Sequence, residues 1–429
     1  MAALNYNGNE PEAGATHPIA KQLSQESTRV REILVYYSGT NGIGGIETLL
    51  ARLLSFLTRV GYAVTCIMRD SSPIANLVIG YRVISLKEGY STLLDTKNLR
   101  KVLSNEKLLN TQAAISLDSD SSILATLTAK LLTNQKCVAI STNWVPNYYS
   151  PTMIRGWHPL ANLRRWNLKK NYSAATTFVM MEKYRQDGRK ALGLKWDAKI
   201  LPIPISYPKS EGLTRTPEKG RIVSIGRLDP MKNYNLYMID AVARLNEQGF
   251  AITWDVYGTG VLQEEMIARI SARNISTIIT LHGDIPYADM PHILSSAHIF
   301  VGMGTASIEA AALGVPGPVA IAFDKSGLTH GSLHHHSFGN CGELEETKSL
   351  RAIEEELIRI LEQNPSEYTE ETKCVREAAS KYSEETVLKT LTNIVESTST
   401  PLTCSVGFAL ACKSYHISRQ VIHRITRRI

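Results

Sequence analysis

Short β-forming runs, glycine-containing loops and helical segments follow one another along this chain in a repeating order. Residues 33–37 (ILVYY) predict a buried strand, a glycine-rich stretch comes next, and leucines recur at helical spacing in residues 46–60. Residues 62–68 predict a second strand. Strand, loop, helix and strand in this order form a βαβ unit, whose strands are parallel. Because the pattern recurs down the chain, we predict an α/β protein with mostly parallel sheets covered by helices.

A change of composition divides the chain into two such halves. Residues 206–220 are rich in proline, glycine and charge, which is typical of a linker. Strands are also expected within 171–181 and at 319–323, and a long helix at 349–361. The length of 429 residues fits two or three domains of about 150 residues each. We predict a flexible leader at 1–31, an N-terminal Rossmann-like domain at 32–205, the linker at 206–220, a C-terminal Rossmann-like domain at 221–383, a closing helix at 384–400 and a basic amphipathic tail at 401–429.

Charge and cysteine content narrow the class of protein. Five of the basic residues lie in the tail, which has no acidic residue, and removing them leaves 42 basic against 40 acidic residues. A body this close to neutral argues against a nucleic-acid partner. The six cysteines include no CxxC pair, and we find neither a signal peptide nor a run of about 18 apolar residues. We therefore expect a cytoplasmic protein with reduced thiols.

Two loops that could bind a ligand follow predicted strands. They therefore lie at the carboxyl edge of a sheet, where parallel α/β sheets bind ligands. The first contains Gly44 and Gly45, which let the backbone approach a ligand, and the helix start behind them favours an anion. A plain turn between strand and helix is the alternative. The second (IGRLDPMKN) carries Arg227 and Lys232 across a turn, where they either bind a diphosphate or form a surface pair without a role.

The segment 302–316 (GMGTASIEAAALGVP) is the most informative loop. A helix is expected to start near Ser307, so the free N–H groups of Ala306 and Ser307 could hold phosphate oxygens. Glu309 falls in the first helical turn, where the helix dipole alone favours an acid, but its carboxylate could also accept hydrogen bonds from a ribose diol. A weaker signal comes from YGTG, whose Gly258 and Gly260 could pack against a nucleotide base.

These segments resemble the retaining glycosyltransferases of family 4. GRLDPMKN (226–233), YGTG (257–260), HGDI (282–285) and SIEAAALGVP (307–316) stand in the order and approximate spacing of that family, and GGIE (44–47) matches its first loop. The resemblance extends over residues 33–395. It implies the GT-B fold, in which two Rossmann-like domains with parallel sheets face a cleft.

The resemblance also implies a role for each matching residue. Arg227 and Lys232 would bind the donor diphosphate and stabilise it as leaving group in place of a metal ion, so no metal and no other cofactor is expected. Glu309 would bind the donor ribose. The remaining matches would bind the sugar phosphate through backbone amides or close over it, and they are Ala306, Ser307, Ile308, Gly44 and Gly45.

Two positions depart from the family pattern. The family has a second glutamate eight residues before the one matched by Glu309, near the donor sugar, and here that position is Val301. The family also has a histidine after a strand of the N-terminal domain, near the reacting centre. Our alignment puts Asp118 there, so Asp118 is the candidate for a polar catalytic contact. Contacts to the sugar hydroxyls must therefore differ from those of the family.

The resemblance implies an enzyme that moves a sugar from a nucleoside-diphosphate donor to a carbohydrate or lipid-linked acceptor, with retention of anomeric configuration. Two alternatives stay open. One is a nucleotide-sugar epimerase of the same fold, which should carry more acid and base side chains around the cleft. The other is a catalytically inactive paralogue that binds nucleotide sugar and acts as a scaffold for polysaccharide assembly.

Two further features need an explanation. The tail mixes apolar residues with Lys413, Arg419 and Arg424, so it could lie on an anionic membrane surface, be a disordered terminus or pack on a partner. The consecutive histidines 334–336 are read as part of an exposed polar loop, because no further ligand spacing of a metal site accompanies them.

Overall fold

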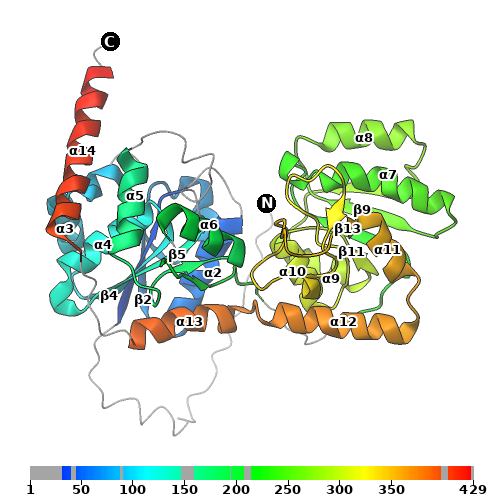
Figure 1. The fold of residues 1–429 in the computed structure, drawn as a ribbon, viewed down its shortest axis with the longest axis horizontal. Coiled ribbons are helices and arrows are strands. Elements are labelled where there is room, and N and C mark those ends of the chain that lie inside the picture. Colours follow the sequence, from blue (N-terminus) through cyan, green and yellow to red (C-terminus); the bar gives the residue numbers. More distant parts are fainter. Residues whose placement is uncertain are drawn as a thin grey trace, which may run out of the picture.

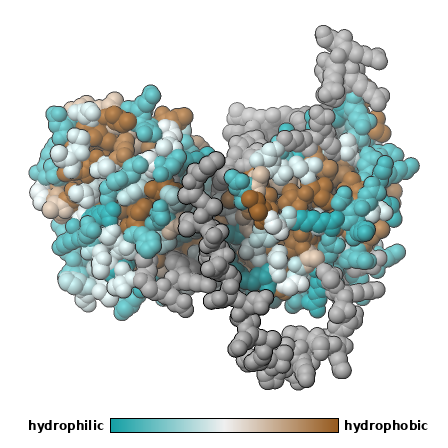
Figure 2. All heavy atoms as spheres, turned by 180° about the vertical axis from the view of Figure 1, so that it is seen from behind, coloured by the Kyte–Doolittle hydropathy of each residue, from teal (hydrophilic) through white to brown (hydrophobic). Residues whose placement is uncertain are grey.

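The computed structural model describes residues 31–39, 45–86, 90–145, 159–193, 195–206, 214–397 and 404–426. The chain forms two lobes that lie side by side in both views of the molecule (Figures 1 and 2). Each lobe has its own hydrophobic core around its own parallel sheet. In the described ranges, none of the helices has the length and apolar composition of a membrane span.

The N-terminal lobe contains a five-stranded parallel sheet of order β3-β2-β1-β4-β5. On one side of this sheet, Leu49, Leu53 and Leu57 of the first helix are fully buried, as their helical spacing predicts. The strands are β1 (Glu32–Tyr37), β2 (Ala63–Met68), β3 (Arg82–Ser85), β4 (Thr111–Asp118) and β5 (Val138–Val145). The helices are α2 (Gly45–Arg59), α3 (Thr96–Asn105), α4 (Ser121–Leu131), α5 (Pro159–Lys170) and α6 (Glu182–Leu192), and the short strands β6 (Phe178–Val179) and β7 (Lys199–Ile200) pair separately.

The C-terminal lobe repeats the architecture with a four-stranded parallel sheet of order β10-β9-β8-β11. Trp254, at the centre of this sheet, is fully buried and donates its indole N–H to Ser224 Oγ at 2.9 Å. The strands are β8 (Arg221–Ile225), β9 (Thr253–Tyr257), β10 (Ile279–Gly283) and β11 (Ile299–Phe300). The helices around it are α7 (Tyr234–Glu247), α8 (Gln263–Ala272), α9 (Met290–Ser295), α10 (Thr305–Ala312) and α11 (Ile353–Leu361); β12 (Leu328–Thr329) and β13 (Arg351–Ala352) form a small antiparallel pair.

Several predicted elements differ from the structure. The strand expected at 319–323 is reduced to single bridges of Val319 and Ala320, because Pro316 and Pro318 interrupt the backbone donors that a ladder needs. The strand expected within 171–181 shrinks to the two residues of β6. The sequence reading also missed α12 (Pro365–Ser380), although its start has a full capping signature in which Asn364 Oδ1 accepts from two backbone N–H groups.

After α12 the chain returns to the N-terminal lobe. Helix α13 (Glu384–Ser397) buries Val387, Leu388 and Leu391 against the N-terminal core, and Figure 1 shows α12 and α13 running along the lower side of the two lobes. The outgoing and returning segments pair at the crossing, where Ile205 N–H donates to Tyr382 O at 2.8 Å. Two hydrogen-bonded segments therefore connect the lobes.

The described part of the tail forms one helix on the N-terminal lobe, α14 (Val406–Thr426). Phe408 and Cys412 are fully buried, and the Phe408 ring meets the Trp166 ring of α5 edge-on at 5.6 Å. Of the three interpretations that the sequence left open, a disordered terminus is therefore wrong for residues 404–426.

The interpretation of the histidine run as an exposed loop is also wrong. His336 is buried, and its Nε2 lies 3.2 Å from Gly331 O. The segment packs against α11 and α12, where Ser332 donates to Glu371 at 2.7 Å and Arg359 pairs with the fully buried Glu356. Sequence polarity failed here because neighbouring polar side chains, among them Ser332, Arg359 and Glu371, pair with one another when they are buried.

Candidate functional site

The two candidate ligand-binding loops of the C-terminal lobe leave the sheet at one point. In the order β10-β9-β8-β11, the chain moves from β8 to one side of the sheet to form β9, whereas β11 lies on the other side of β8. The carboxyl ends of β8 and β11 therefore frame the topological switch point, where open α/β sheets bind ligands. The loop after β8 holds Arg227 and Lys232, and the loop after β11 leads into α10 with Glu309.

The loop after β8 presents two cations in different environments. Asp229 Oδ1 accepts from Met231 N–H at 3.1 Å and fixes the short helical turn that ends at Lys232. Lys232 folds back over Gly226, so that its Nζ lies 1.9 Å from where a Cβ of residue 226 would stand. Burial lowers the pKa of Lys232, with Arg227 adding to the decrease and Asp229 opposing it. Arg227 is 68% exposed and reaches outward, 3.6 Å from Asp229.

The YGTG loop (257–260) is hydrogen-bonded to the loop that carries Arg227 and Lys232. Gly226 N–H donates to Tyr257 O at 2.9 Å, and Leu228 N–H donates to Thr259 O at 2.8 Å. A Cβ at Gly258 would stand 2.1 Å from Gly226 O, and one at Gly260 would stand 2.2 Å from Leu228 O. These two glycines therefore allow the two loops to cross at backbone contact, while their contact with a nucleotide base stays a prediction.

We expect Gly258→Ala to destabilise the C-terminal lobe by about 1–3 kcal/mol, because the new methyl group forces two backbones apart at a positive φ. Gly249→Ala is the matched control, since residue 249 also has a positive φ but open space around its Cβ position. Urea unfolding of both variants separates the two causes. Equal losses would show that backbone conformation, not loop contact, determines the requirement for glycine at 258.

The start of α10 has the geometry that a phosphate site needs, and its occupation stays a prediction. Gly304 takes a φ of 74° in front of the helix, with open space where its Cβ would be. Ser307 Oγ donates to Gly304 O at 2.7 Å. The backbone N–H groups of Ala306 and Ser307 belong to the first turn, which has no intrahelical acceptor, whereas Ile308 is the fourth residue of α10 and its N–H bonds back to Gly304. Val301, which stands where the resembled family has its first glutamate, is fully buried in the core.

Glu309 is the centre of an interdomain cluster that the sequence reading did not find. Its carboxylate is 6% exposed, and Oε1 accepts from Arg52 Nη2 at 3.0 Å and from the Tyr287 hydroxyl at 2.6 Å. Arg52 belongs to α2 of the other lobe and also donates to Pro204 O at 2.8 Å. In the described residues no donor reaches Oε2, and the contact of Glu309 with a donor ribose stays a prediction. Burial raises the pKa of Glu309, while Arg52 and Tyr287 oppose the increase.

Asp118 stands where β4 ends, and its carboxylate is bonded within its own lobe. It is 3% exposed and accepts from Ser38 N–H and Oγ at 2.8 and 2.7 Å, and from the backbone N–H groups of Asp120 and Ser121 at 2.8 and 2.9 Å. Asp118 thus joins the end of β1 to the start of α4. The predicted catalytic contact of Asp118 with substrate stays a prediction, and it would require one of these bonds to be exchanged.

The predicted glycine loop of the N-terminal lobe is covered only in part. Gly44 lies outside the described residues, and Gly45 is the first residue of α2. Glu47, in the first turn of α2, is buried and accepts from the Tyr37 hydroxyl at 2.6 Å. In the described part of the chain, no group of three or more His, Cys, Asp or Glu side chains could hold a metal ion.

Arg52 could have been found from the sequence. It is the one charged residue in the run LLARLL, on a helix whose leucines are buried on both sides of it. A charge in that position needs a buried partner. The partner lies 257 residues away, so the sequence alone does not identify it.

Comparisons with known proteins agree with this architecture. Residues 209–381 match the sequence family described as Glycosyl transferases group 1. No curated protein is significantly similar in sequence over the chain. Similar solved structures include HepE of Anabaena in complex with UDP (TM-score 0.61, 14% identity, 86% of this chain and 100% of that chain). Others are the lipopolysaccharide outer core galactosyltransferase WaaB (0.58, 13%, 85% and 99%) and a sucrose-phosphate synthase from Thermosynechococcus elongatus (0.55, 14%, 85% and 98%). The chain thus has the GT-B fold, as predicted.

Proposed function

We propose that this protein transfers a sugar from a nucleoside-diphosphate sugar to a carbohydrate or lipid-linked acceptor. The main support for the proposal is a shared location. Two cations, Arg227 and Lys232, and the acid Glu309 lie on loops and a helix that meet at one switch point of the C-terminal sheet. Cations suit a diphosphate, and the free oxygen of Glu309 suits a ribose diol. The match of residues 209–381 to the group 1 glycosyltransferases supports the same donor class. HepE, of the same fold, binds UDP and UDP-glucose.

The reaction in this proposal needs no metal ion. The acceptor hydroxyl oxygen forms a bond to the anomeric carbon, the bond from that carbon to the diphosphate breaks, and its electron pair passes to the phosphate oxygen. Lys232 and Arg227 stabilise this developing charge, and the departing diphosphate takes the hydroxyl proton. Transfer and departure on the same face retain the anomeric configuration. Our proposal includes retention because Asp118 is bonded within its lobe and no other base candidate emerged from the sequence.

The test is a thermal-shift panel of UDP, GDP, ADP and their glucose conjugates, with and without EDTA, followed by a transfer and hydrolysis assay with the donor that binds. We expect one nucleotide series to stabilise the protein with or without EDTA, and Glu309→Ala to lose that shift. Glu362→Ala, an exposed control, should keep it. Binding without transfer or hydrolysis would favour the scaffold alternative, and no binding by any nucleotide would contradict the proposal.

The exposed face of α14 supports a second part of the proposal, peripheral contact with an anionic membrane. Val406, Leu410, Ile417 and Val421 lie on one helical face, opposite the buried Phe408 and Cys412, and all four are 48–70% exposed. Helix α14 contains basic but no acidic residues, so its charge complements an anionic lipid surface. A lipid-linked acceptor would be reached from such a position.

We expect the protein to co-sediment with phosphatidylglycerol vesicles but not with phosphatidylcholine vesicles. A Leu410→Glu, Ile417→Glu variant should lose this binding, because it places charge on the apolar stripe. Val261→Glu changes an exposed apolar residue of the other lobe and should leave binding unchanged. Equal binding of the α14 variant would exclude this helix as the contact.

A further inference from the structure

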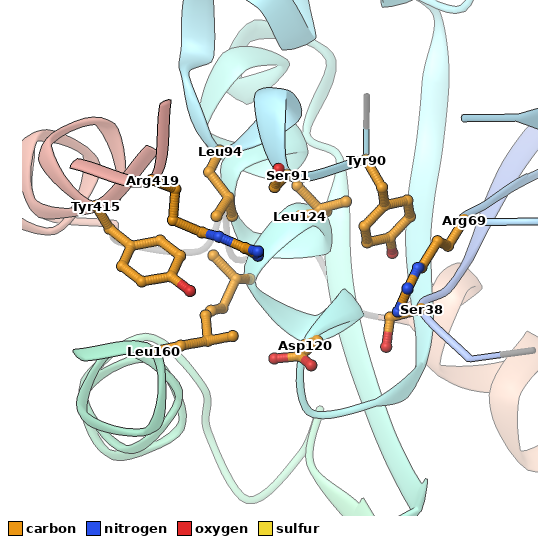
Figure 3. Close-up of a pocket in the computed structure, with 11 residues that line it drawn as sticks. Ser38, Arg69, Tyr90, Ser91, Leu94, Asp120, Leu124, Leu160, Tyr415 and Arg419 are labelled. Carbon is orange, nitrogen blue, oxygen red and sulfur yellow. The ribbon is translucent and has the colours of Figure 1, made fainter. Parts of the chain in front are cut away.

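A cavity of about 330 Å³ lies between α14 and the sheet of the N-terminal lobe. Its size is at the lower end of the range for small-molecule sites. Figure 3 shows it enclosed by side chains from several elements, with Tyr415 and Arg419 reaching in from α14 and Asp120 on the opposite wall. Leu94, Leu124 and Leu160 supply its apolar surface.

The cavity lies at the switch point of the N-terminal sheet. In the order β3-β2-β1-β4-β5, β2 lies on one side of β1 and β4 on the other. Ser38 follows β1, Arg69 follows β2 and Asp120 follows β4, and all three line the cavity. It therefore occupies the edge of this sheet at which ligands bind, as the donor residues do in the other lobe.

Helix α14 completes this cavity with the same face that anchors it. Phe408, Cys412, Tyr415 and Arg419 follow at helical spacing, so they share one side of the helix. The first two are buried in the core of the lobe, and the last two extend over the cavity. The anchoring of Phe408 against Trp166 thus fixes where Arg419 stands.

The polar groups of the cavity favour an anion with hydroxyl groups beside it. Two guanidinium groups, of Arg69 and Arg419, line it, whereas its carboxylate, Asp120, is held by Arg164 of α5. The Tyr90 hydroxyl is buried with no hydrogen-bond partner among the described residues. A buried hydroxyl without a partner is costly, and a bound ligand that offers an oxygen would remove that cost.

We propose that this cavity binds the phosphate ester of a sugar as acceptor, with Arg69 and Arg419 on the phosphate and the Tyr90 hydroxyl on an ester or sugar oxygen. The assignment of the ligand as acceptor rests on the proposed glycosyl transfer, whereas the binding itself does not. The C-terminal helix is thereby a part of substrate recognition. The ester is either free or carried on a lipid, since both present the same phosphate and sugar.

The test measures binding of glucose 6-phosphate, glucose and a polyprenyl-linked glucosyl phosphate in detergent micelles by titration calorimetry. We expect one of the two phosphates to bind and glucose to bind at least roughly tenfold more weakly, since a charge-assisted contact is lost. Binding of glucose 6-phosphate identifies a free ester, and binding of the polyprenyl-linked glucosyl phosphate alone identifies a lipid-carried one. Equal binding of glucose and glucose 6-phosphate, or no binding of either phosphate, would overturn the proposal.

Variants test the residues and separate this proposal from the donor site. Arg419→Ala and Arg69→Ala should each weaken phosphate binding roughly tenfold, and Tyr90→Phe should weaken it without loss of stability. Lys413→Ala removes a charge from the same helix outside the cavity and should change nothing. All four variants should keep the nucleotide shift of the wild type. Phosphate binding without any nucleotide binding would leave the cavity site intact and refute the glycosyl-transfer proposal, whereas unchanged phosphate binding by Arg419→Ala would refute the role of α14.

Discussion

Lys232→Ala should lower the rate of sugar transfer about 10²–10³-fold while leaving the fold intact. The substitution removes a positive charge placed where the leaving diphosphate would gain negative charge, and the loss of a single preorganised group of this kind costs a factor of that order. Lys232 is half-buried and folds over Gly226, so its ammonium already lies against the loop that follows β8. The measurement is kcat and KM for transfer with the donor identified by thermal shift.

The separate values of kcat and KM distinguish leaving-group stabilisation from simple binding. A contact stronger in the transition state lowers kcat, whereas uniform binding of the donor raises KM alone. Lys219→Ala, at an exposed position in the same lobe, is the charge-matched control and should behave as wild type. A Lys232→Ala enzyme with unchanged kcat would contradict the assigned role and would indicate that the loop after β8 is only structural.

The sequence predicted the parts of the site that depend on local pattern. Glycine loops after strands, the cations at 227 and 232 and the acid at 309 each follow from a short segment and its place in a βαβ unit. The sequence placed these loops after strands, at the ligand-binding edge of a sheet, whereas the strand order that creates the switch point comes from the structure. These features could be predicted because a parallel sheet brings successive loops to one edge.

The sequence did not predict contacts between distant segments. The partner of Arg52 is Glu309 of the other lobe, and no local pattern connects them. The tail offered three interpretations because its composition suits a membrane, a partner or disorder equally well. What determines its position is Phe408 against Trp166 and Cys412 in the core of the N-terminal lobe, both of which are tertiary contacts.

Arg52→Ala should move the loss of nucleotide-sugar binding at low pH to a higher pH. A ribose diol donates to the ionised Glu309 carboxylate, so binding falls as pH falls through the pKa of Glu309. Burial raises that pKa, and Arg52 is the first of the groups that oppose the increase. Removing Arg52 therefore raises the pKa further, so that the carboxylate becomes protonated at a pH where the wild type still binds. At pH 8 the variant should bind almost as the wild type does.

Affinity for the nucleotide sugar from pH 5 to 8 is the measurement, since both phosphates of a nucleotide sugar stay ionised throughout. Arg52→Lys keeps the charge near Glu309 but loses the fork that joins it to Pro204, so its curve should lie between the other two. Glu309→Gln should weaken binding roughly tenfold or more. It should also abolish the loss of affinity at low pH, because the carboxylate that titrates there is gone. If Arg52→Ala instead binds more tightly at every pH, Arg52 competes with the ribose, and the interdomain pair is a latch that the donor must open.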